Sequence, residues 1–405
     1  MSETLQGVKV LEIANWVAAP SACAMLADMG AEVIKIEPPE TGDAVRSLSI
    51  TTKGIGTHES GVNVTFEQLN RGKQSMGINL EVAEAQETIR QLATTVDVLV
   101  TNLTPHRQLR YGVTYEDIVA VNPRIVYLNL TGYGMEGPER DRSGFDYAAF
   151  WARSGIMATL GELGEPPVQQ RPGFGDQTTS LAMVAAVGMA LFERERSGKG
   201  QRIDCALLHT ALWADAPDLV ASMKDDAPTP RNNRKQAANA LFNFYETKDG
   251  KWIQLVMIQS VRFWEGFCRA LDIEHLTNDA RFESHEARTE NSAELLRIVT
   301  DLFAQRTRDE WAVRLDEGRC IWAPVQTLDE IGRDPQVLAN EYTTTLEHAE
   351  DGEFRVVQAP MKFHRTPAAA TSPAPELGQH TESVLLDHGY TWDDISALKD
   401  AGAII

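Results

Sequence analysis

An aspartate between glycines is the side chain best suited to covalent chemistry. Residues 173–180 read Gly-Phe-Gly-Asp-Gln-Thr-Thr-Ser, and the helical pattern over residues 178–196 puts Asp176 at the expected N-cap. The flanking glycines leave its carboxylate sterically open, and a helix N-terminus favours the ionised form. Neighbouring N–H groups could hold a developing oxyanion, so Asp176 could act as a covalent nucleophile. A helix cap without catalytic function is the alternative explanation of the same residue.

Basic residues follow the ends of several expected strands, where an open α/β sheet binds its ligands. Such a cluster could pair with an anionic ligand even in an acidic protein, although most Lys and Arg side chains only face solvent. The residues are Arg71, Lys73, Arg107, Arg110, Arg140 and Arg142.

Other common catalytic signatures are missing from the sequence. Residues 15–20, which join the first strand to its helix, read Asn-Trp-Val-Ala-Ala-Pro and lack the glycines of a dinucleotide site, so NAD binding is not expected. None of the nine histidines stands in a metal-ligand or serine-hydrolase pattern. The four cysteines are scattered without CxxC spacing. We therefore expect reduced thiols and no metal.

Length and charge narrow the class of partner. The chain has 405 residues and a formal net charge of −20, which repels nucleic-acid phosphates on average. No stretch reaches the roughly 20 apolar residues of a membrane span, and the first residues do not have the pattern of a secretory signal. We expect a cytoplasmic protein that binds neither nucleic acid nor membrane.

The elements that must position these residues alternate in type along the first half of the chain. Strand patterns separated by helical patterns predict a parallel sheet with helices on both faces. Thr114 and Asp117 have the spacing of a capping box at the start of one short helix. The strands are expected at residues 8–14, 32–37, 96–100, 124–131 and 202–207, and the helices at residues 20–30, 82–93, 115–121 and 178–196.

The second half of the chain has a different organisation. Residues 223–240 are polar and irregular and read as a linker. A hairpin is expected over residues 241–257, followed by helices at residues 261–271, 293–304 and 309–317, with Asn291 or Ser292 and Thr307 placed as caps. Further helices are expected near the C-terminus, at residues 381–388 and 392–401.

Several segments, taken in order along nearly the whole chain, resemble the CaiB/BaiF family (family III) of CoA-transferases. They are LQGVKVLEIANWVAAPSACAMLADMGAEVIKIEPPETGD, LNRGKQSMGINL, VDVLVTNLTPHRQLRYGV, IVYLNLTGYGMEGPERDRSGFDYAAFWARSG, GFGDQTTS, GKGQRIDCALL and LGQHTESVLLDHGYTWDDISALKDAGAI.

The resemblance implies an enzyme that moves coenzyme A from an acyl-CoA donor to a carboxylic acid acceptor. It implies that Asp176 is the nucleophile, through an aspartyl anhydride and an aspartyl-CoA thioester. Coenzyme A would be a substrate, with no tightly bound cofactor and no metal. The coenzyme A contacts would fall on Val17, Ala18, Lys73, Asn102, Leu103 and Arg110.

Departures from the family pattern bear on the choice of substrate. Members that act on oxalate have Gln where this chain has Val17, Arg where it has Pro38, and a glycine-rich loop where residues 236–244 read QAANALFNF. The racemase branch uses a His at the position of Phe145, and Phe cannot exchange a proton. A racemase and a catalytically silent CoA-binding protein remain as alternatives. The acyl group cannot be read from the sequence.

The resemblance also implies an architecture. A large doubly wound, Rossmann-like α/β domain would be formed by both chain ends, residues 1–220 and 340–405. A smaller α+β domain would span residues 225–335. Two chains would form an interlocked homodimer.

Overall fold

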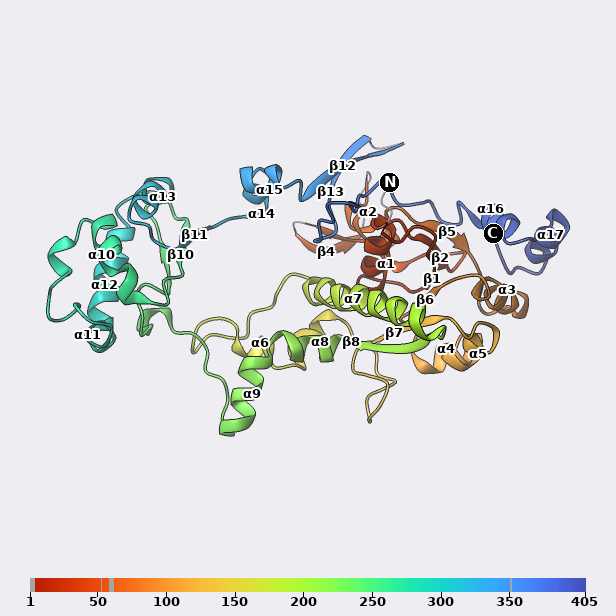
Figure 1. Ribbon diagram of the computed structural model, residues 1–405, viewed down its shortest axis with the longest axis horizontal. Helices are drawn as coiled ribbons and strands as arrows, with labels where there is room; N and C mark the ends of the chain where they lie inside the picture. Colours follow the sequence, from red (N-terminus) through yellow and green to blue (C-terminus); the bar gives the residue numbers. More distant parts are fainter. Residues whose placement is uncertain (1–3, 52, 58–61, 350–351) are drawn as a thin grey trace. The chain divides into compact units, whose positions relative to one another are not determined.

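The structure, a computed structural model, describes residues 4–51, 53–57, 62–349 and 352–405. The chain forms two compact units, each with its own core (Figure 1). The first comprises Met1–Ala158, Gln169–Ala227 and Asn340–Ile405, and therefore includes both ends of the chain. The second comprises Thr159–Val168 and Pro228–Ala339. The short segment Thr159–Val168 groups with the second unit although it precedes Asp176 in the sequence.

A six-stranded sheet forms the centre of the first unit, in the order β5-β2-β1-β6-β7-β8. All of its neighbouring strands pair in parallel. Its inner strands are short apolar runs buried on both faces, as parallel strands covered by helices must be. The strands are β1 (Lys9–Ile13), β2 (Glu32–Glu37), β5 (Gln74–Gly77), β6 (Val98–Thr101), β7 (Val126–Thr131) and β8 (Gln201–Ala206).

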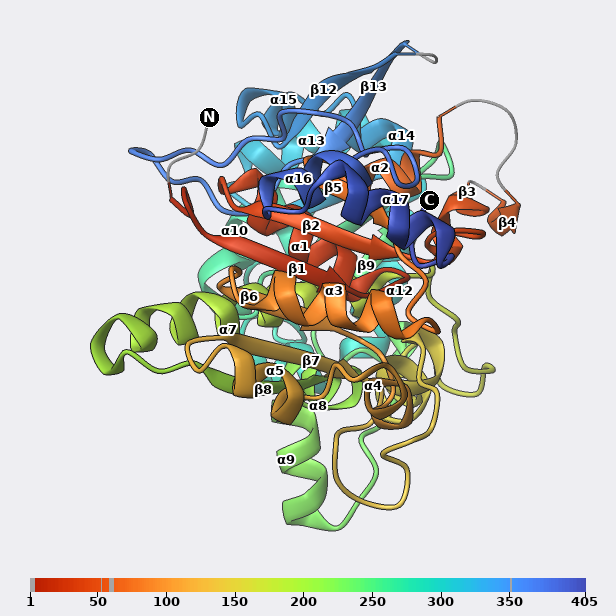
Figure 2. The ribbon, with the colours of Figure 1, turned by 90° about the vertical axis from the view of Figure 1, so that its right-hand side faces the viewer.

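One face of the sheet is covered by helices from the two ends of the unit's sequence. α3 (Ala83–Ala93) and α5 (Tyr115–Val121) pack there beside α16 (Thr381–Asp387) and α17 (Trp392–Asp400), and Figure 2 shows α3, α16 and α17 on this face. Leu11 and Ile34 of the sheet share this core with Ile89 of α3 and Leu385 of α16. The predicted capping box of Thr114 and Asp117 is present at the start of α5.

The opposite face is covered by α1 (Ala18–Asp28) and α7 (Phe174–Ser197), which contact each other and the strands beneath them. α1 begins two residues before the expected position, so Pro20 lies inside its first turn. α7 begins four residues before the expected position, with Gly173 as its N-cap. Asp176 therefore lies in the first turn of α7, and its expected place at the N-cap is wrong.

The second unit contains a three-stranded antiparallel sheet, β11-β10-β9, packed against helices. β9 (Phe244–Glu246) and β10 (Trp252–Leu255) form the predicted hairpin. Thr307 caps its helix in a capping box, whereas Asn291 makes no side-chain cap bond. The other elements are β11 (Trp322–Val325), α10 (Ser260–Ala270), α11 (His285–Glu290), α12 (Ser292–Phe303), α13 (Arg308–Glu317), α14 (Leu328–Ile331) and α15 (Pro335–Ala339), with 3₁₀ turns at Arg234–Gln236 and Glu274–Leu276.

Smaller elements complete the structure. Two antiparallel hairpins are formed by β3 (Leu48–Thr51) with β4 (Gly54–Thr57) and by β12 (Thr343–His348) with β13 (Gly352–Val357). The remaining helices are α2 (Val64–Asn70), α4 (Pro105–Tyr111), α6 (Ile156–Thr159), α8 (Leu207–Ala214) and α9 (Ala216–Asp225), with a 3₁₀ turn at Ala44–Arg46 and a π-helix at Asp146–Ala152. Within the described ranges, no helix is both long and apolar enough to span a bilayer.

Candidate active site

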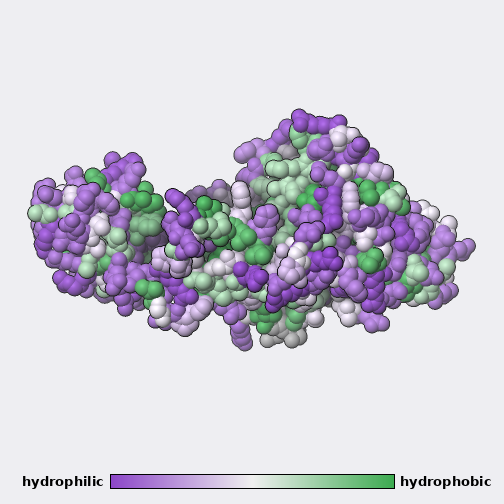
Figure 3. Space-filling model, turned by 90° about the horizontal axis from the view of Figure 1, so that it is seen from below, coloured by the Kyte–Doolittle hydropathy of each residue, from purple (hydrophilic) through white to green (hydrophobic). Residues whose placement is uncertain are grey.

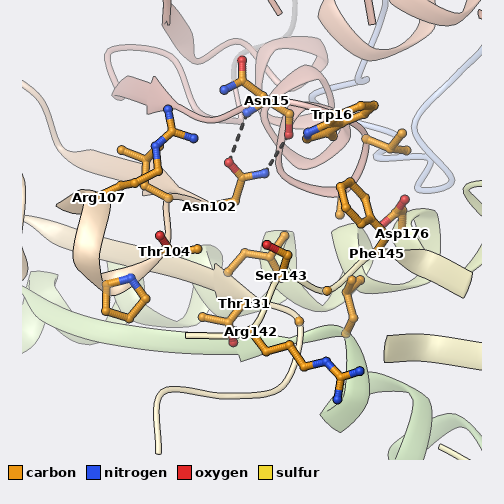
Figure 4. A pocket seen from close by; sticks show the side chains of 18 of the residues that line it. Asn15, Trp16, Asn102, Thr104, Arg107, Thr131, Arg142, Ser143, Phe145 and Asp176 are labelled. Atoms are coloured by element: carbon orange, nitrogen blue, oxygen red, sulfur yellow. Dashed lines mark hydrogen bonds between the residues drawn. The ribbon is translucent and has the colours of Figure 1, made fainter. Parts of the chain in front are cut away.

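A cavity of 190 Å³ lies at the carboxyl ends of the central strands (Figure 4). In the sheet order, β2 and β5 lie on one side of β1, and β7 and β8 lie beyond β6. The strand order therefore reverses between β1 and β6, which is where open α/β sheets bind ligands. Asn15–Ala18 follow β1 and Asn102–Pro105 follow β6, and both segments line the cavity. Four of the expected contact residues, Val17, Ala18, Asn102 and Leu103, are brought together here with Asp176.

Hydrogen bonds between the Asn102 side chain and the Asn15 backbone join these two loops. The Asn15 N–H donates to Asn102 Oδ1 at 3.1 Å, and Asn102 Nδ2 donates to the Asn15 carbonyl at 2.7 Å (Figure 4). Because one side chain satisfies both groups of the Asn15 backbone, the loop after β1 is held against the loop after β6. Asn102 thus shapes the cavity as well as lining it.

The aromatic residue that follows Asn15 has an unusual backbone conformation. Trp16 has φ 74°, in the left-handed region, which is unfavourable for a residue that has a Cβ. Its N–H donates to Oδ1 of the buried Asp43 at 3.1 Å, which holds the conformation in place. The Trp16 ring packs edge-on against Phe145, with 5.3 Å between ring centroids. This aromatic pair stands beside Asp176 at the wall of the cavity.

A different aspartate caps the helix that carries Asp176. The Gly173 N–H donates to Asp146 Oδ2 at 2.7 Å, and the N–H groups of Gly175 and Asp176 further stabilise the charge of Asp146. A Cβ on Gly175 would collide with Asp146 Oδ1 and the Phe150 ring, so this approach requires glycine. Because Asp146 satisfies the helix N-terminus, the carboxylate of Asp176 is not needed as a cap.

The electrostatic environment of Asp176 differs from the one expected for a helix N-terminus. Burial, together with repulsion from the Asp146 carboxylate, raises the pKa of Asp176 to about 7. Burial also raises the pKa of Asp146, although its backbone donors oppose that shift. The expectation that the helix dipole keeps Asp176 strongly ionised is therefore wrong, because the donors of α7 are directed at Asp146. Asp176 is divided between its acid and its carboxylate form near neutral pH.

Three arginines supply positive charge to the cavity: Arg107 on α4, and Arg140 and Arg142 in the loop before Phe145. Arg140 pairs with Asp141 at 3.2 Å and Arg142 pairs with Glu139 at 2.8 Å. Arg107 lies over the Tyr111 ring and makes no ion pair within the part of the chain that the structure describes. In Figure 4 Arg107 and Asp176 lie on opposite sides of the cavity.

The other two expected contacts lie outside the lining of this cavity. Lys73 is buried, with its Nζ 2.7 Å from Glu12 Oε2 and 2.9 Å from the Pro20 carbonyl. Its positive charge pairs with a buried carboxylate. The phosphate-binding role expected for Lys73 does not fit this buried position. Arg110 is exposed and pairs with Glu81 at 2.5 Å.

A neighbouring cavity of 230 Å³ extends the site toward Arg110. It shares Asn15, Leu103 and Arg107 with the first cavity, and its lining includes Glu81, the partner of Arg110. An elongated ligand could therefore pass from Asp176 along α4. Such a ligand would have Arg107 in the middle of its path and Arg110 at the far rim.

Sequence reasoning missed two residues of this site. In the sequence Trp16 stands out only as part of a glycine-free loop, and no pattern marks Asp146 as a cap. Asp146 lies 27 residues from Gly173 along the chain. The position of Trp16 could have indicated a role in the site, because Trp16 follows Asn15 directly after a strand end. Nothing in the local sequence indicates that Asp146 contacts α7.

Comparison with known proteins adds independent information. Residues 5–381 match the family described as CoA-transferase family III. The chain is 32% identical to (R)-2-hydroxy-4-methylpentanoate CoA-transferase of Clostridioides difficile, over 99% of each chain. It is 31% identical to cinnamoyl-CoA:phenyllactate CoA-transferase of Clostridium sporogenes, over 97% of this chain and 95% of that one. A solved CaiB/BaiF family protein from Brucella suis has 27% identity and a TM-score of 0.83, over 96% of this chain and all of that one.

Proposed function

The chain belongs to CoA-transferase family III and transfers coenzyme A between carboxylic acids, and from this premise we propose that Asp176 carries the transferred groups covalently. The observation that supports this most directly is that two neighbouring aspartates have different roles. Asp146 caps α7, so the Asp176 side chain is not needed as a cap. It lines the cavity at the carboxyl ends of β1 and β6. A carboxylate with a pKa near 7 is available as a nucleophile at neutral pH.

The reaction proceeds through two kinds of covalent intermediate. The Asp176 carboxylate attacks the donor thioester, which forms a mixed anhydride and breaks the C–S bond, so coenzyme A leaves as a thiolate. The thiolate attacks the aspartyl carbonyl and releases the donor acid, which leaves an aspartyl-CoA thioester. The acceptor carboxylate attacks this thioester, forming a second anhydride and freeing the thiolate again. The thiolate then attacks the acceptor acyl carbonyl, which yields the new acyl-CoA and restores the Asp176 carboxylate.

The cavity has the charge needed to hold coenzyme A along this path. Val17, Ala18, Asn102 and Leu103 would contact the part of the molecule nearest the thioester. Arg107, which has no ion-pair partner among the described residues, would pair with its phosphates, and Arg110 would meet the far end through the adjoining cavity. Coenzyme A enters as a substrate and leaves as a product.

The racemase alternative finds no support in the site. Phe145 lines the cavity beside Asp176, where a proton-exchanging side chain would be required, and its ring carries no acidic proton. We therefore assign transfer, and not α-proton exchange, to this site.

We further propose that the first unit is doubly wound and that two chains assemble as an interlocked homodimer. Parallel strands, an order that reverses between β1 and β6, and helices on both faces support the first proposal. Exposed apolar side chains on α7 and α8 support the second, with Met189 73%, Phe192 64% and Trp213 80% exposed in the single chain. Figure 3 shows hydrophobic residues exposed among hydrophilic ones on the face seen from below. A second copy would cover such residues.

Replacement of Asp176 tests the covalent mechanism. Asp176→Asn and Asp176→Ala should both abolish transfer, while Asp393→Asn, also in the first turn of a helix, should retain it. Hydroxylamine added to the wild-type enzyme during turnover should convert the aspartyl thioester to a hydroxamate on the peptide that contains Asp176, detected by mass spectrometry. Near-normal transfer by Asp176→Asn, with no adduct on that peptide, would show that the mechanism is wrong.

A further inference from the structure

Asp176 also borders a second cavity, to which the proposed reaction assigns no ligand. This cavity has a volume of 120 Å³ and shares Trp16, Val17, Phe145 and Asp176 with the first one. Because these side chains line both spaces, the Trp16–Phe145 pair and Asp176 form the wall between them. A thioester carbonyl at Asp176 would therefore have one of its two substituents in each cavity.

The lining of the second cavity is almost entirely apolar. The hydroxyls of Ser49 and Thr65 are engaged with each other, since they lie 3.2 Å apart and the Ile50 N–H donates to Thr65 Oγ1 at 2.9 Å. The side chain of Tyr147 also lines the cavity. No Lys or Arg of the described residues lines it, and its charged groups are the carboxylates of Asp146 and Asp176. The apolar and aromatic residues are Trp16, Val17, Val45, Leu48, Ile50, Ile55, Phe145, Tyr147 and Pro172.

A glycine lines this cavity close to Asp176. Gly173, the N-cap of α7, has φ 86°, which favours glycine. A Cβ placed there would lie 3.6 Å from Ile50 Cδ1 and 3.7 Å from Val17 Cγ1. The side chains of Ile50 and Val17 thus pack next to Gly173, which has no side chain and lies three residues before Asp176.

The two cavities differ in the chemistry that they can bind. The first contains Arg107, Arg140 and Arg142, which suits the phosphates of coenzyme A, and the second contains no cation. A second carboxylate on the acyl group would lose its hydration in the apolar cavity and would lie near two acidic side chains. An alkyl or aryl group would instead replace water against aliphatic walls.

We infer that the second cavity binds the acyl group and selects monocarboxylic acids with an apolar alkyl or aryl substituent, against dicarboxylic acids. This inference rests on the proposed reaction at Asp176 for the direction in which the acyl group points. It concerns only which acyl groups bind, so it can be tested without turnover.

Equilibrium binding to the intact Asp176→Asn protein provides the test. Succinyl-CoA and 4-methylpentanoyl-CoA are a matched pair, because a terminal carboxylate in one takes the place of an isopropyl group in the other. By calorimetry, 4-methylpentanoyl-CoA should bind at least tenfold more tightly than free coenzyme A, and succinyl-CoA should bind no more tightly than coenzyme A. Equal affinity for the two esters, or tighter binding of succinyl-CoA, would overturn the inference.

A variant in the cavity locates the effect. Ile50→Ala in the same background should reduce the advantage of 4-methylpentanoyl-CoA over coenzyme A about fivefold and leave the affinity for coenzyme A itself unchanged. That unchanged affinity also shows that the variant is folded. Val121→Ala, at the end of α5 and outside the linings of both cavities, is the control and should preserve the full advantage. An advantage that survives Ile50→Ala undiminished would contradict the assignment of this cavity.

These outcomes separate the two proposals. If wild-type protein transfers coenzyme A through Asp176 but the binding preference is reversed, only the substrate class is wrong. If the preference holds but no adduct forms at Asp176, the covalent mechanism is wrong and the acyl cavity stands.

Discussion

As the proposed nucleophile, Asp176 would have to lose its proton before it could attack a thioester. Burial and the neighbouring Asp146 carboxylate raise its pKa to about 7, so ionisation falls within the physiological range. The same two aspartates have separate duties, since Asp146 binds the backbone donors of α7. Rate and stability should therefore both depend on pH through this pair.

The rate of transfer should rise with pH and level off above about 7, because only ionised Asp176 is a nucleophile. Asp146→Asn should move the midpoint to lower pH, since a neutral amide no longer repels the Asp176 charge. Asn can still accept the Gly173 N–H, so the helix cap should survive. Initial rates at saturating substrate, measured across pH for both proteins, provide the comparison. A midpoint that does not move would show that Asp146 does not control the ionisation of Asp176.

Asp176→Asn should stabilise the folded protein at high pH. The pKa of Asp176 is raised above its unfolded value, so the native state binds more protons than the unfolded state between pH 4 and 7, and stability falls as pH rises through that window. Removing the charge should recover on the order of 4 kcal/mol at pH 8, because the pKa shift from 3.8 to about 7 spans about three units at about 1.4 kcal/mol each, and nothing at pH 3. Denaturant unfolding at the two pH values measures the difference. A variant less stable than wild type at pH 8 would contradict this prediction.

At the scale of the elements, a buried charge network supports the loop after β1. Lys35 Nζ lies 2.8 Å from both Glu12 Oε1 and Asp43 Oδ2, and Lys73 Nζ lies 2.7 Å from Glu12 Oε2. Burial alone would raise the pKa of Glu12, but Lys35 and Lys73 together hold it below its usual value. Asp43 in turn accepts the Trp16 N–H, so the network reaches the active-site loop.

Lys73→Met should destabilise the fold by about 3–5 kcal/mol, because it leaves an uncompensated buried negative charge. Coenzyme A affinity of the folded protein should change little, because Lys73 lies outside the cavity. Lys9→Met is the control, since Lys9 pairs with Glu32 at the surface at 3.8 Å and should contribute about 0–1 kcal/mol. Urea unfolding and calorimetric titration give the two quantities. A large loss of coenzyme A affinity in folded Lys73→Met would restore the phosphate-binding role.

The helix α4 should bind coenzyme A through its arginines. Arg107→Ala should weaken binding by about 1–3 kcal/mol, as expected for a charge-assisted contact. Arg110→Ala should weaken coenzyme A binding less, because Arg110 lies at the rim farthest from Asp176 and is already paired with Glu81. Arg124→Ala is the control, since Arg124 precedes β7 at the opposite edge of the sheet. Equal affinity in the Arg107 and Arg124 variants would place the phosphates elsewhere.

At the scale of the whole molecule, the exposed apolar side chains of α7 and α8 favour a stable assembly. An interlocked dimer cannot separate without partial unfolding, so it should persist at nanomolar concentration and unfold as one cooperative unit. Sedimentation velocity over a dilution series measures this. A monomer that appears on dilution would count against the interlocked architecture.

The amino-acid sequence by itself determined the parts of this protein that depend on local patterns. Apolar runs predicted five of the six strands of the parallel sheet but missed the more polar edge strand β5, Thr114 and Asp117 predicted a capping box, and the glycine-flanked Asp176 marked the candidate nucleophile. Family III motifs identified the transferase activity, and the matches to known CoA-transferases agree with that reading. Each of these signals lies within one element or one short segment, where spacing alone carries the information.

Only the tertiary structure decided what depends on residues far apart in the chain. Asp146 reaches Gly173 from another segment and caps α7, and burial together with the Asp146 charge raises the pKa of Asp176. Lys73 is buried beside Glu12, although most lysines in proteins face solvent. The apolar cavity combines β3, the loop after β1 and the start of α7. Burial and charge pairing are properties of such assembled neighbourhoods, and residue spacing along one chain segment does not encode them.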